Sequence, residues 1–124
     1  MDCRGARGAC LGREVLPYLV RRTPVAKSAF QAPGERPDAC RHFDTIEVSE
    51  LPLVAGGITL ADDFVTKGNT LLGAASRLAT TLASGTPTAF APVRTMGLQP
   101  DVDQIVDPGV GTIRRVGDDA RRKP

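Results

Sequence analysis

Two adjacent carboxylates, Asp62 and Asp63, directly follow an apolar run that ends at Ala61. Carboxylates at a strand end can accept hydrogen bonds from the two hydroxyls of a ribose. A turn of small and polar residues comes next, made of Thr66, Lys67, Gly68, Asn69 and Thr70. Such a turn lets backbone N–H groups converge on a phosphate, and a following helix adds the positive end of its dipole. Together these residues predict a site for a phosphorylated sugar.

The side chains of this turn offer further contacts to a phosphate. Thr66 and Thr70 can donate hydroxyl hydrogens, and Gly68 permits a close approach of the backbone. The ammonium group of Lys67 can attract the anion or face solvent, and its backbone N–H is useful in either case. A purely structural interpretation stays open, in which Asn69 or Thr70 is the N-cap of the helix.

The acidic pair also has a structural interpretation, in which Asp63 caps the turn while Asp62 is solvated. Strand alternation turns neighbouring side chains in opposite directions. Both carboxylates therefore reach one sugar only if the chain bends at the strand end.

Two other phosphate-binding motifs are excluded. The Walker A pattern Gly-x-x-x-x-Gly-Lys-Ser/Thr does not occur in the chain. The glycines of a dinucleotide fingerprint follow a strand, whereas Gly56-Gly57 precede one. The phosphate chemistry therefore depends on residues 66–70.

The elements around the turn should present it at the edge of a sheet. Ile58 to Ala61 is an almost continuous apolar run, typical of a buried parallel strand. A helix is expected after the turn, because apolar residues recur on one face over about three turns. These residues are Leu71, Leu72, Ala75, Leu78, Ala79 and Leu82. Ser84 to Pro87 should stop the helix, with Gly85 as its C-cap.

Thr88 to Thr95 is expected to form the next strand. Pro92 is awkward in its middle, because proline cannot donate a hydrogen bond to a sheet ladder. Strand, helix and strand make a βαβ unit with a right-handed crossover, whose ligands bind beyond the carboxyl ends of the strands. The fold class is therefore expected to be α/β.

The segment before the motif is less regular. Apolar spacing over Leu11 to Val20 predicts a short amphipathic helix that Pro17 shortens or kinks. Arg21 to His42 is basic and rich in proline and glycine, which predicts a long mobile loop containing the lone His42. This loop either closes over an anionic substrate or is a solvated connector. Phe43 to Val48 is expected to be a short strand.

The two ends of the chain are expected to contribute little. Residues 1–10 show no helical or strand period and are interpreted as a flexible start. Asp101 to Pro108 is expected to form a short helical turn, residues 109–111 a turn, and Thr112 to Val116 a final strand. Residues 117–124 are expected to be a frayed, charged tail.

Composition excludes several classes of protein. Hydrophobic residues make up 41% and charged residues 24% of the chain, which is ordinary globular usage and excludes wholesale disorder. The net charge of +2 is too small to attract nucleic acid or a membrane by itself, so we expect neither partner. No apolar run approaches the roughly 20 residues that cross a bilayer. Three cysteines without zinc or disulfide spacing fit a reducing compartment, and we expect a cytoplasmic protein.

The segment from Ile58 to Thr70, Ile-Thr-Leu-Ala-Asp-Asp-Phe-Val-Thr-Lys-Gly-Asn-Thr, resembles the phosphoribosyl pyrophosphate (PRPP) binding motif of type I phosphoribosyltransferases. In that family two acidic residues follow hydrophobic ones, and two more hydrophobic residues precede a Thr/Ser-Gly turn. The resemblance extends from about Leu11 to Ile113. It implies a doubly wound, mainly parallel sheet with flanking helices.

The resemblance also implies roles for individual residues. Asp62 and Asp63 would contact the ribose hydroxyls, and residues 66–70 would hold the 5′-phosphate of PRPP or of a nucleoside monophosphate. Lys67 stands where the family often has a second threonine. The family's mobile loop precedes the motif, which makes three basic residues candidates to contact pyrophosphate: Lys27, Arg36 and Arg41.

The implied reaction displaces pyrophosphate from ribose C1 with a nitrogen nucleophile. Mg²⁺ bound with PRPP would neutralise the leaving group. Positioning and electrostatic stabilisation carry such catalysis, so no nucleophilic Ser, Cys or His is needed.

The chain departs from the family at its N-terminal side. The family normally has a strand, a helix and a pyrophosphate-binding loop there, which ten unpatterned residues cannot supply. We therefore expect residues 11–116 to be the C-terminal part of such a domain, either truncated or completed by a second copy or another chain. Three functions stay open: a phosphoribosyltransferase, a non-catalytic regulator that senses PRPP or a nucleotide, and an inactive truncated fragment.

Overall fold

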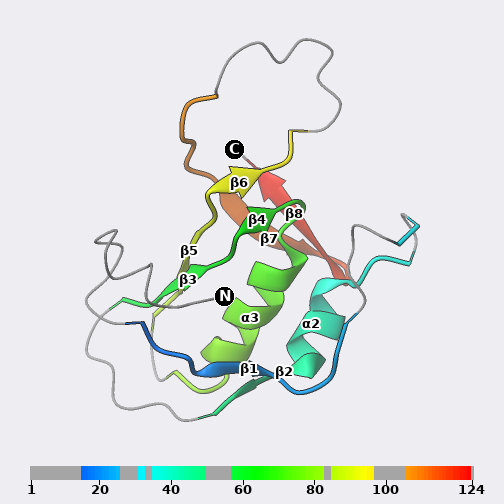
Figure 1. The fold of residues 1–124 in the computed structure, drawn as a ribbon, viewed down its shortest axis with the longest axis vertical. Coiled ribbons are helices and arrows are strands. Elements are labelled where there is room, and N and C mark those ends of the chain that lie inside the picture. The colour runs from blue at the N-terminus through cyan, green and yellow to red at the C-terminus, as the bar shows by residue number, and fades with distance from the viewer. Residues whose placement is uncertain are drawn as a thin grey trace.

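The computed structural model describes residues 15–25, 31–32, 35–49, 57–82, 85–96 and 106–123. These ranges contain two helices and eight short strands (Figure 1). In chain order the elements are β1 Leu19–Arg21, α2 Ala39–Thr45, β2 Ile46–Val48, β3 Thr59–Ala61, β4 Phe64–Val65, α3 Asn69–Ala79, β5 Thr88–Phe90, β6 Val93–Arg94, β7 Thr112–Val116 and β8 Asp119–Lys123. The described part of the chain is therefore a mixed α/β structure, as the sequence predicts.

Two parallel strand pairs carry the motif. β3 pairs with β5, with Ala61 opposite Phe90, and β4 pairs with β6. The N–H of Asp62 continues the first ladder with a 3.0 Å hydrogen bond to the carbonyl of Phe90. α3 connects β4 to β5, so the expected order of strand, helix and parallel strand is confirmed. Pro92 lies between β5 and β6, where its missing N–H interrupts the ladder.

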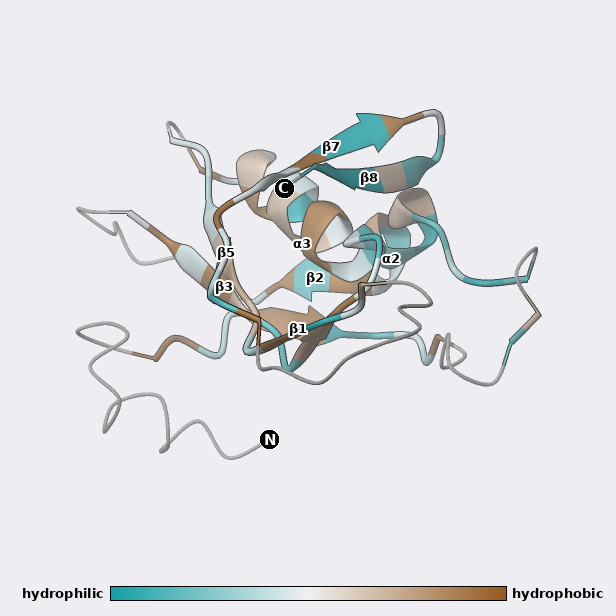
Figure 2. Cartoon of the chain, turned by 90° about the horizontal axis from the view of Figure 1, so that it is seen from above, coloured by the Kyte–Doolittle hydropathy of each residue, from teal (hydrophilic) through white to brown (hydrophobic). Residues whose placement is uncertain are grey.

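Two antiparallel pairs complete the sheets of the described ranges. β1 pairs with β2, and β7 pairs with β8. Figure 2 shows α3 between these two pairs, with the β7–β8 hairpin on one side and β1 and β2 on the other. The small parallel and antiparallel sheets thus surround one central helix.

The core forms where α3 meets the strands. Its buried apolar residues are Ile46, Leu60, Val65, Leu71, Ala74 and Leu78. Two of them, Leu71 and Leu78, come from the helix face that the sequence periodicity marks. The prediction for that face is wrong at two positions, because Ala74 is buried and Ala79 is exposed. Burying a leucine or isoleucine side chain contributes about 1.5–3 kcal/mol, so this cluster fixes the position of α3.

The two helices cross closely at Gly73. A Cβ atom there would lie 2.6 Å from the Cβ of His42 and 2.8 Å from the carbonyl oxygen of Ala39. The guanidinium of Arg77 lies 5.0 Å from the ring centroid of Phe43, which adds a cation–π contact between the same helices. Glycine in the middle of α3 therefore allows α2 to approach, and this approach brings His42 against α3.

Several expectations for the N-terminal side are wrong. Residues 15–18 have no regular structure and Leu19–Arg21 is a strand, because pairing with β2 overrides the helical apolar spacing. Phe43 and His42 lie in α2, which Asp38 caps, so only Ile46–Val48 of the expected strand is a strand. His42 is buried and not a loop residue.

Expectations for the C-terminal side also need correction. The tail is not frayed, because residues 119–123 form β8 and bury Ala120. Thr80, not Gly85, is the C-cap of α3. Residues 106–111 form neither a helical turn nor a tight turn before β7. The predictions for residues 1–14, Lys27 and residues 101–105 lie outside the described ranges.

Neither α2 nor α3, the helices of the described ranges, is long and apolar enough to cross a membrane.

We predict that Gly68→Ala destabilises the fold more than Gly85→Ala does. Both glycines have positive φ, but only at Gly68 would a Cβ meet a neighbour, the side chain of Ile113 at 2.7 Å. The backbone strain alone should cost about 1 kcal/mol, and overpacking should add about 1–3 kcal/mol at Gly68. Urea unfolding of the three proteins measures both values, and equal losses would contradict the Ile113 contact.

Candidate functional site

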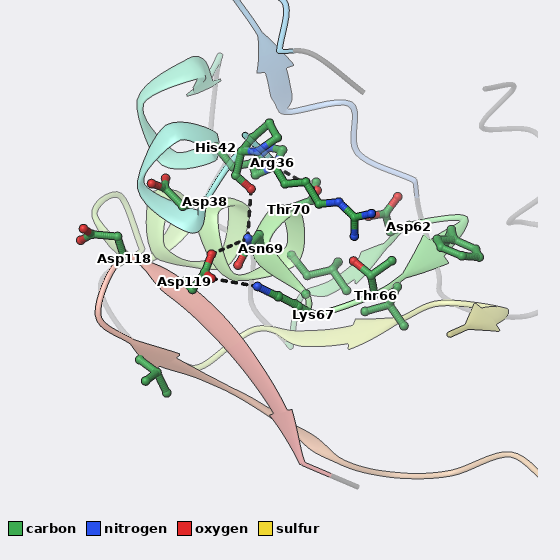
Figure 3. A pocket seen from close by; sticks show the side chains of 16 residues that line it. Arg36, Asp38, His42, Asp62, Thr66, Lys67, Asn69, Thr70, Asp118 and Asp119 are labelled. Carbon is green, nitrogen blue, oxygen red and sulfur yellow. Dashed lines mark hydrogen bonds and ion pairs between the residues drawn. The ribbon is translucent and has the colours of Figure 1, made fainter. Parts of the chain in front are cut away.

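A cavity of about 430 Å³ lies at the N-terminal end of α3 (Figure 3). Its walls come from the strand end and turn of the motif, the segment before α2, α2 itself and the β7–β8 hairpin. The lining residues are Arg36, Pro37, Asp38, His42, Asp62, Phe64, Val65, Thr66, Lys67, Gly68, Asn69, Thr70, Leu71, Val116, Asp118 and Asp119. All five predicted turn residues thus share one cavity with Asp62.

The N-terminus of α3 in this wall has no side-chain cap. Gly68 is the N-cap residue, in the left-handed conformation with φ +96°, so the alternative with Asn69 or Thr70 as N-cap is wrong. The N–H of Leu72 donates the bond to the carbonyl of Gly68, at 2.8 Å. The N–H groups of the three preceding helical residues have no partner within the helix, and the positive end of the helix dipole lies with them. This end of α3 is therefore suited to an anion.

The two adjacent carboxylates have different surroundings. Asp62 is half-buried and lines the cavity, whereas Asp63 is exposed and is absent from the cavity wall. The N–H of Asp63 donates a 3.0 Å hydrogen bond to Asp62 Oδ1. Burial, and then the side chain of Asp63, raise the pKa of Asp62, while the N–H of Asp63 and the charge of Arg21 act against this rise. Asp62 is thus the carboxylate of the pair that a ligand in the cavity would meet.

Lys67 and Asn69 bind the C-terminal hairpin. Lys67 Nζ donates to Asp119 Oδ2 at 3.0 Å, and Asn69 Nδ2 donates to Asp119 Oδ1 at 3.0 Å. Asn69 Oδ1 accepts from the N–H of Ala120 at 2.6 Å. The hydrogen bonds from Lys67 and then Asn69 lower the pKa of Asp119. We call Lys67, Asn69 and Asp119 the Asp119 clamp; it engages two side chains that the sequence predicts as phosphate ligands.

Carboxylates outnumber cationic side chains in the cavity wall. The carboxylates are Asp38, Asp62, Asp118 and Asp119, and the cationic side chains are Arg36 and Lys67. No group of three or more His, Cys, Asp or Glu side chains that could hold a metal ion occurs in the described ranges. This charge balance suits a ligand that presents hydroxyls to carboxylates and has its phosphate at the helix end, or that carries its own cation.

The three basic residues predicted as loop contacts are separated by the structure. Arg36 lines the cavity, and Figure 3 shows its side chain extending across it. Arg41 is exposed on α2 and is not among the lining residues. Lys27 lies outside the described ranges.

His42 and the hairpin carboxylates were missed as site residues. The Gly117-Asp118 pair between two strand-like runs is a hairpin signal that could have placed Asp118 and Asp119 on a folded element. For His42 the available signal is the spacing of Asp38 before Ala39–Thr45, which is that of an N-cap. The N–H of Arg41 does donate a 2.7 Å bond to Asp38 Oδ1.

Comparisons with protein-family models, with curated proteins and with solved structures found no match. The candidate site joins a strand end with a carboxylate, a turn and an uncapped helix N-terminus around one cavity.

We predict that the pKa of Asp62 lies above the pKa of an ordinary aspartate and that the pKa of Asp119 lies below it. ¹³C NMR titration of the carboxyl carbons should place the pKa of Asp62 above that value and the pKa of Asp119 below it. Lys67→Gln should raise the pKa of Asp119, because the bond from Lys67 is the largest cause of its lowering. The pKa of Asp62 serves as the internal control and should not move.

The lowered pKa of Asp119 also makes the stability of the fold depend on pH. The pKa of Asp119 is lower in the folded state, so its contribution is present above the unfolded-state pKa and is lost as the pH falls through the folded-state pKa. Lys67→Gln should reduce this acid-dependent loss of stability. An unchanged Asp119 titration in this variant would show that the clamp is absent in solution.

Proposed function

We propose that this chain is a phosphoribosyltransferase-like protein that binds PRPP or ribose 5-phosphate in the cavity at the start of α3. As an enzyme, alone or together with another chain, it would transfer the phosphoribosyl group to a nitrogenous base or amine with release of pyrophosphate. This proposal implies that the α/β elements belong to a doubly wound, mainly parallel sheet of the phosphoribosyltransferase type.

One observation carries the proposal. The uncapped N-terminus of α3 and the carboxylate of Asp62 lie in the wall of one cavity, and the turn 66–68 joins the strand to the helix. A phosphate at the helix N-terminus would accept hydrogen bonds from backbone N–H groups that have no helical partner. The carboxylate at the strand end would accept hydrogen bonds from sugar hydroxyls. A phosphorylated sugar presents both groups in one molecule.

The surroundings of Asp62 favour this role. The burial that raises its pKa also lowers the local dielectric, which strengthens the hydrogen bonds that the carboxylate accepts. Thr66 and Thr70 line the same cavity and supply hydroxyl groups beside the helix end. These features support a ribose at Asp62 and a 5′-phosphate at residues 66–70.

Magnesium enters the proposal as part of the substrate. The ion would arrive bound to the diphosphate of PRPP. It would neutralise the leaving pyrophosphate, while the protein would hold the ribose and the phosphate in place. Catalysis would then come from positioning and from electrostatic stabilisation of the cationic sugar.

A second candidate function is binding without catalysis. It is favoured by the position of Asp63 outside the cavity wall and by the engagement of Lys67 with Asp119. Such a protein would sense PRPP or a nucleotide through the same site. Pyrophosphate release in the presence of a panel of bases distinguishes the two functions.

We predict that PRPP with Mg²⁺ binds the folded protein and that Asp62→Asn weakens binding roughly tenfold or more. Loss of a hydrogen bond to a charged group costs about 1.5–3 kcal/mol, which corresponds to this range. Asp63→Asn is the matched comparison, because it removes the same charge from the neighbouring residue outside the cavity wall, and it should cost less. Titration calorimetry measures all three affinities.

Two results would count against the proposal. Absence of PRPP binding by a folded sample would exclude both the enzyme and the sensor. A larger loss for Asp63→Asn than for Asp62→Asn would show that the ribose does not meet Asp62 in the cavity.

We predict that Asp119→Asn strengthens the binding of ribose 5-phosphate several-fold. The change removes the carboxylate that now neutralises Lys67, while the amide can still accept the bond from Asn69. Asp118→Asn is the matched control, because it removes one charge from the same cavity wall without freeing Lys67. Equal effects of the two changes would show that only the general charge of the cavity matters.

A further inference from the structure

His42 is buried between two polar side chains from distant parts of the chain. Arg21 Nη2 of β1 lies 3.2 Å from His42 Nδ1, and Thr70 Oγ1 of α3 lies 3.4 Å from His42 Nε2. The Arg21 guanidinium is held in turn by Thr45, whose Oγ1 accepts from Arg21 Nη1 at 2.8 Å. The close approach of α2 at Gly73 keeps the imidazole in this position.

This arrangement determines which ring nitrogen carries the proton. A guanidinium has only donors, so Nδ1 facing Arg21 must be the acceptor and carries no hydrogen. A neutral imidazole then has its hydrogen on Nε2, which faces Thr70. Burial, and then the charge of Arg21, lower the pKa of His42, with Asp38 acting in the opposite direction, so the neutral form is favoured.

The tautomer of His42 sets the direction of the Thr70 hydroxyl. Because His42 Nε2–H donates, Thr70 Oγ1 accepts, and the hydroxyl hydrogen of Thr70 points elsewhere. Thr70 lines the cavity and is the second residue of α3, beside the N–H groups that have no helical partner. Its hydroxyl therefore adds a donor to a helix end that already presents only donors.

We infer that the Arg21–His42–Thr70 chain of hydrogen bonds directs the Thr70 hydroxyl hydrogen into the cavity, which makes His42 a positioning residue for the phosphate of the ligand. The inference rests on the proposed function for the nature of the ligand. It adds the reason why this wall selects a phosphate. With the hydrogen on Nδ1, Thr70 would donate to the ring and would present only a lone pair to the cavity. An unprotonated phosphate oxygen has no hydrogen to donate to that lone pair.

The tautomer is tested in the free protein. His42 is the single histidine of the chain, so ¹⁵N labelling of histidine gives one imidazole spectrum without assignment. At neutral pH, long-range ¹H–¹⁵N correlations should show a hydrogen on Nε2 and none on Nδ1. A hydrogen on Nδ1 would overturn the inference whether or not a ligand binds.

The effect on the ligand is tested with ribose 5-phosphate as the probe. His42→Leu should weaken its binding about tenfold, the value of one hydrogen bond to a charged group. His42→Gln retains an amide donor near the position of Nε2. Its affinity for ribose 5-phosphate should therefore stay within about threefold of that of the wild-type protein. Thr70→Ser should bind similarly to wild type, and Thr70→Val should lose about as much as His42→Leu.

A double-mutant cycle separates positioning from a merely structural role. In the Thr70→Val background, His42→Leu should cause no further loss, because the hydroxyl through which it acts is gone. Equal losses of affinity in both backgrounds would overturn the inference, because His42 would then act independently of Thr70. If His42→Leu does not fold, the Thr70→Ser and Thr70→Val pair decides together with the tautomer measurement, and equal binding by these two variants would overturn the inference.

Failure of the proposed function has a different signature. A wild-type protein that carries the Nε2–H tautomer but binds no ribose 5-phosphate overturns the proposed function, and with it the role of His42 toward a ligand. If the wild-type protein binds ribose 5-phosphate but the losses of affinity in the double-mutant cycle are additive, only the positioning role of His42 is overturned.

Discussion

The side chain of Asn69 joins three segments that are distant in sequence. Its amide donates to the carbonyl of Pro37 and to Asp119, and its carbonyl oxygen accepts from the N–H of Ala120. All polar atoms of the amide are therefore engaged, which is what a partly buried polar network needs in order to be stabilising. The segment before α2, the start of α3 and the start of β8 meet at this point, and the candidate cavity lies among them. This one side chain therefore ties together three segments that border the cavity.

Two glycines that the packing requires, Gly68 and Gly73, also affect which polar groups line the cavity. Gly68 must be glycine because its backbone is left-handed and because Ile113 packs against it. The same residue leaves the helix N-terminus without a side-chain cap, so the N–H groups stay available to an anion. Gly73 lets α2 approach α3, and this places His42 next to Thr70. Features required for the fold therefore also set the hydrogen-bonding character of the cavity wall.

The electrostatics of the cavity differ from those of a simple phosphate site. Burial raises the pKa of Asp62 at one side, and hydrogen bonds from Lys67 and Asn69 lower the pKa of Asp119 at the other. The hairpin thus places a carboxylate on the lysine that would otherwise attract a phosphate. Under the proposed function, a phosphate would meet backbone and hydroxyl donors, and it would gain the charge of Lys67 only by competing with Asp119. This competition would make the hairpin part of the site and not only a cover for α3.

Local sequence patterns determined the strand at 59–61, the turn at 66–68 and the helix that follows, because periodicity and turn chemistry act over a few residues. They also placed Asp62 at a strand end, where it does line the cavity. Tertiary structure alone decided which polar groups meet. Asp119 is 50 residues away from Asn69, and no local pattern states which distant segment packs beside a side chain. Residues 19–21 became a strand for the same reason, since the backbone partners in β2 outweighed the helical spacing.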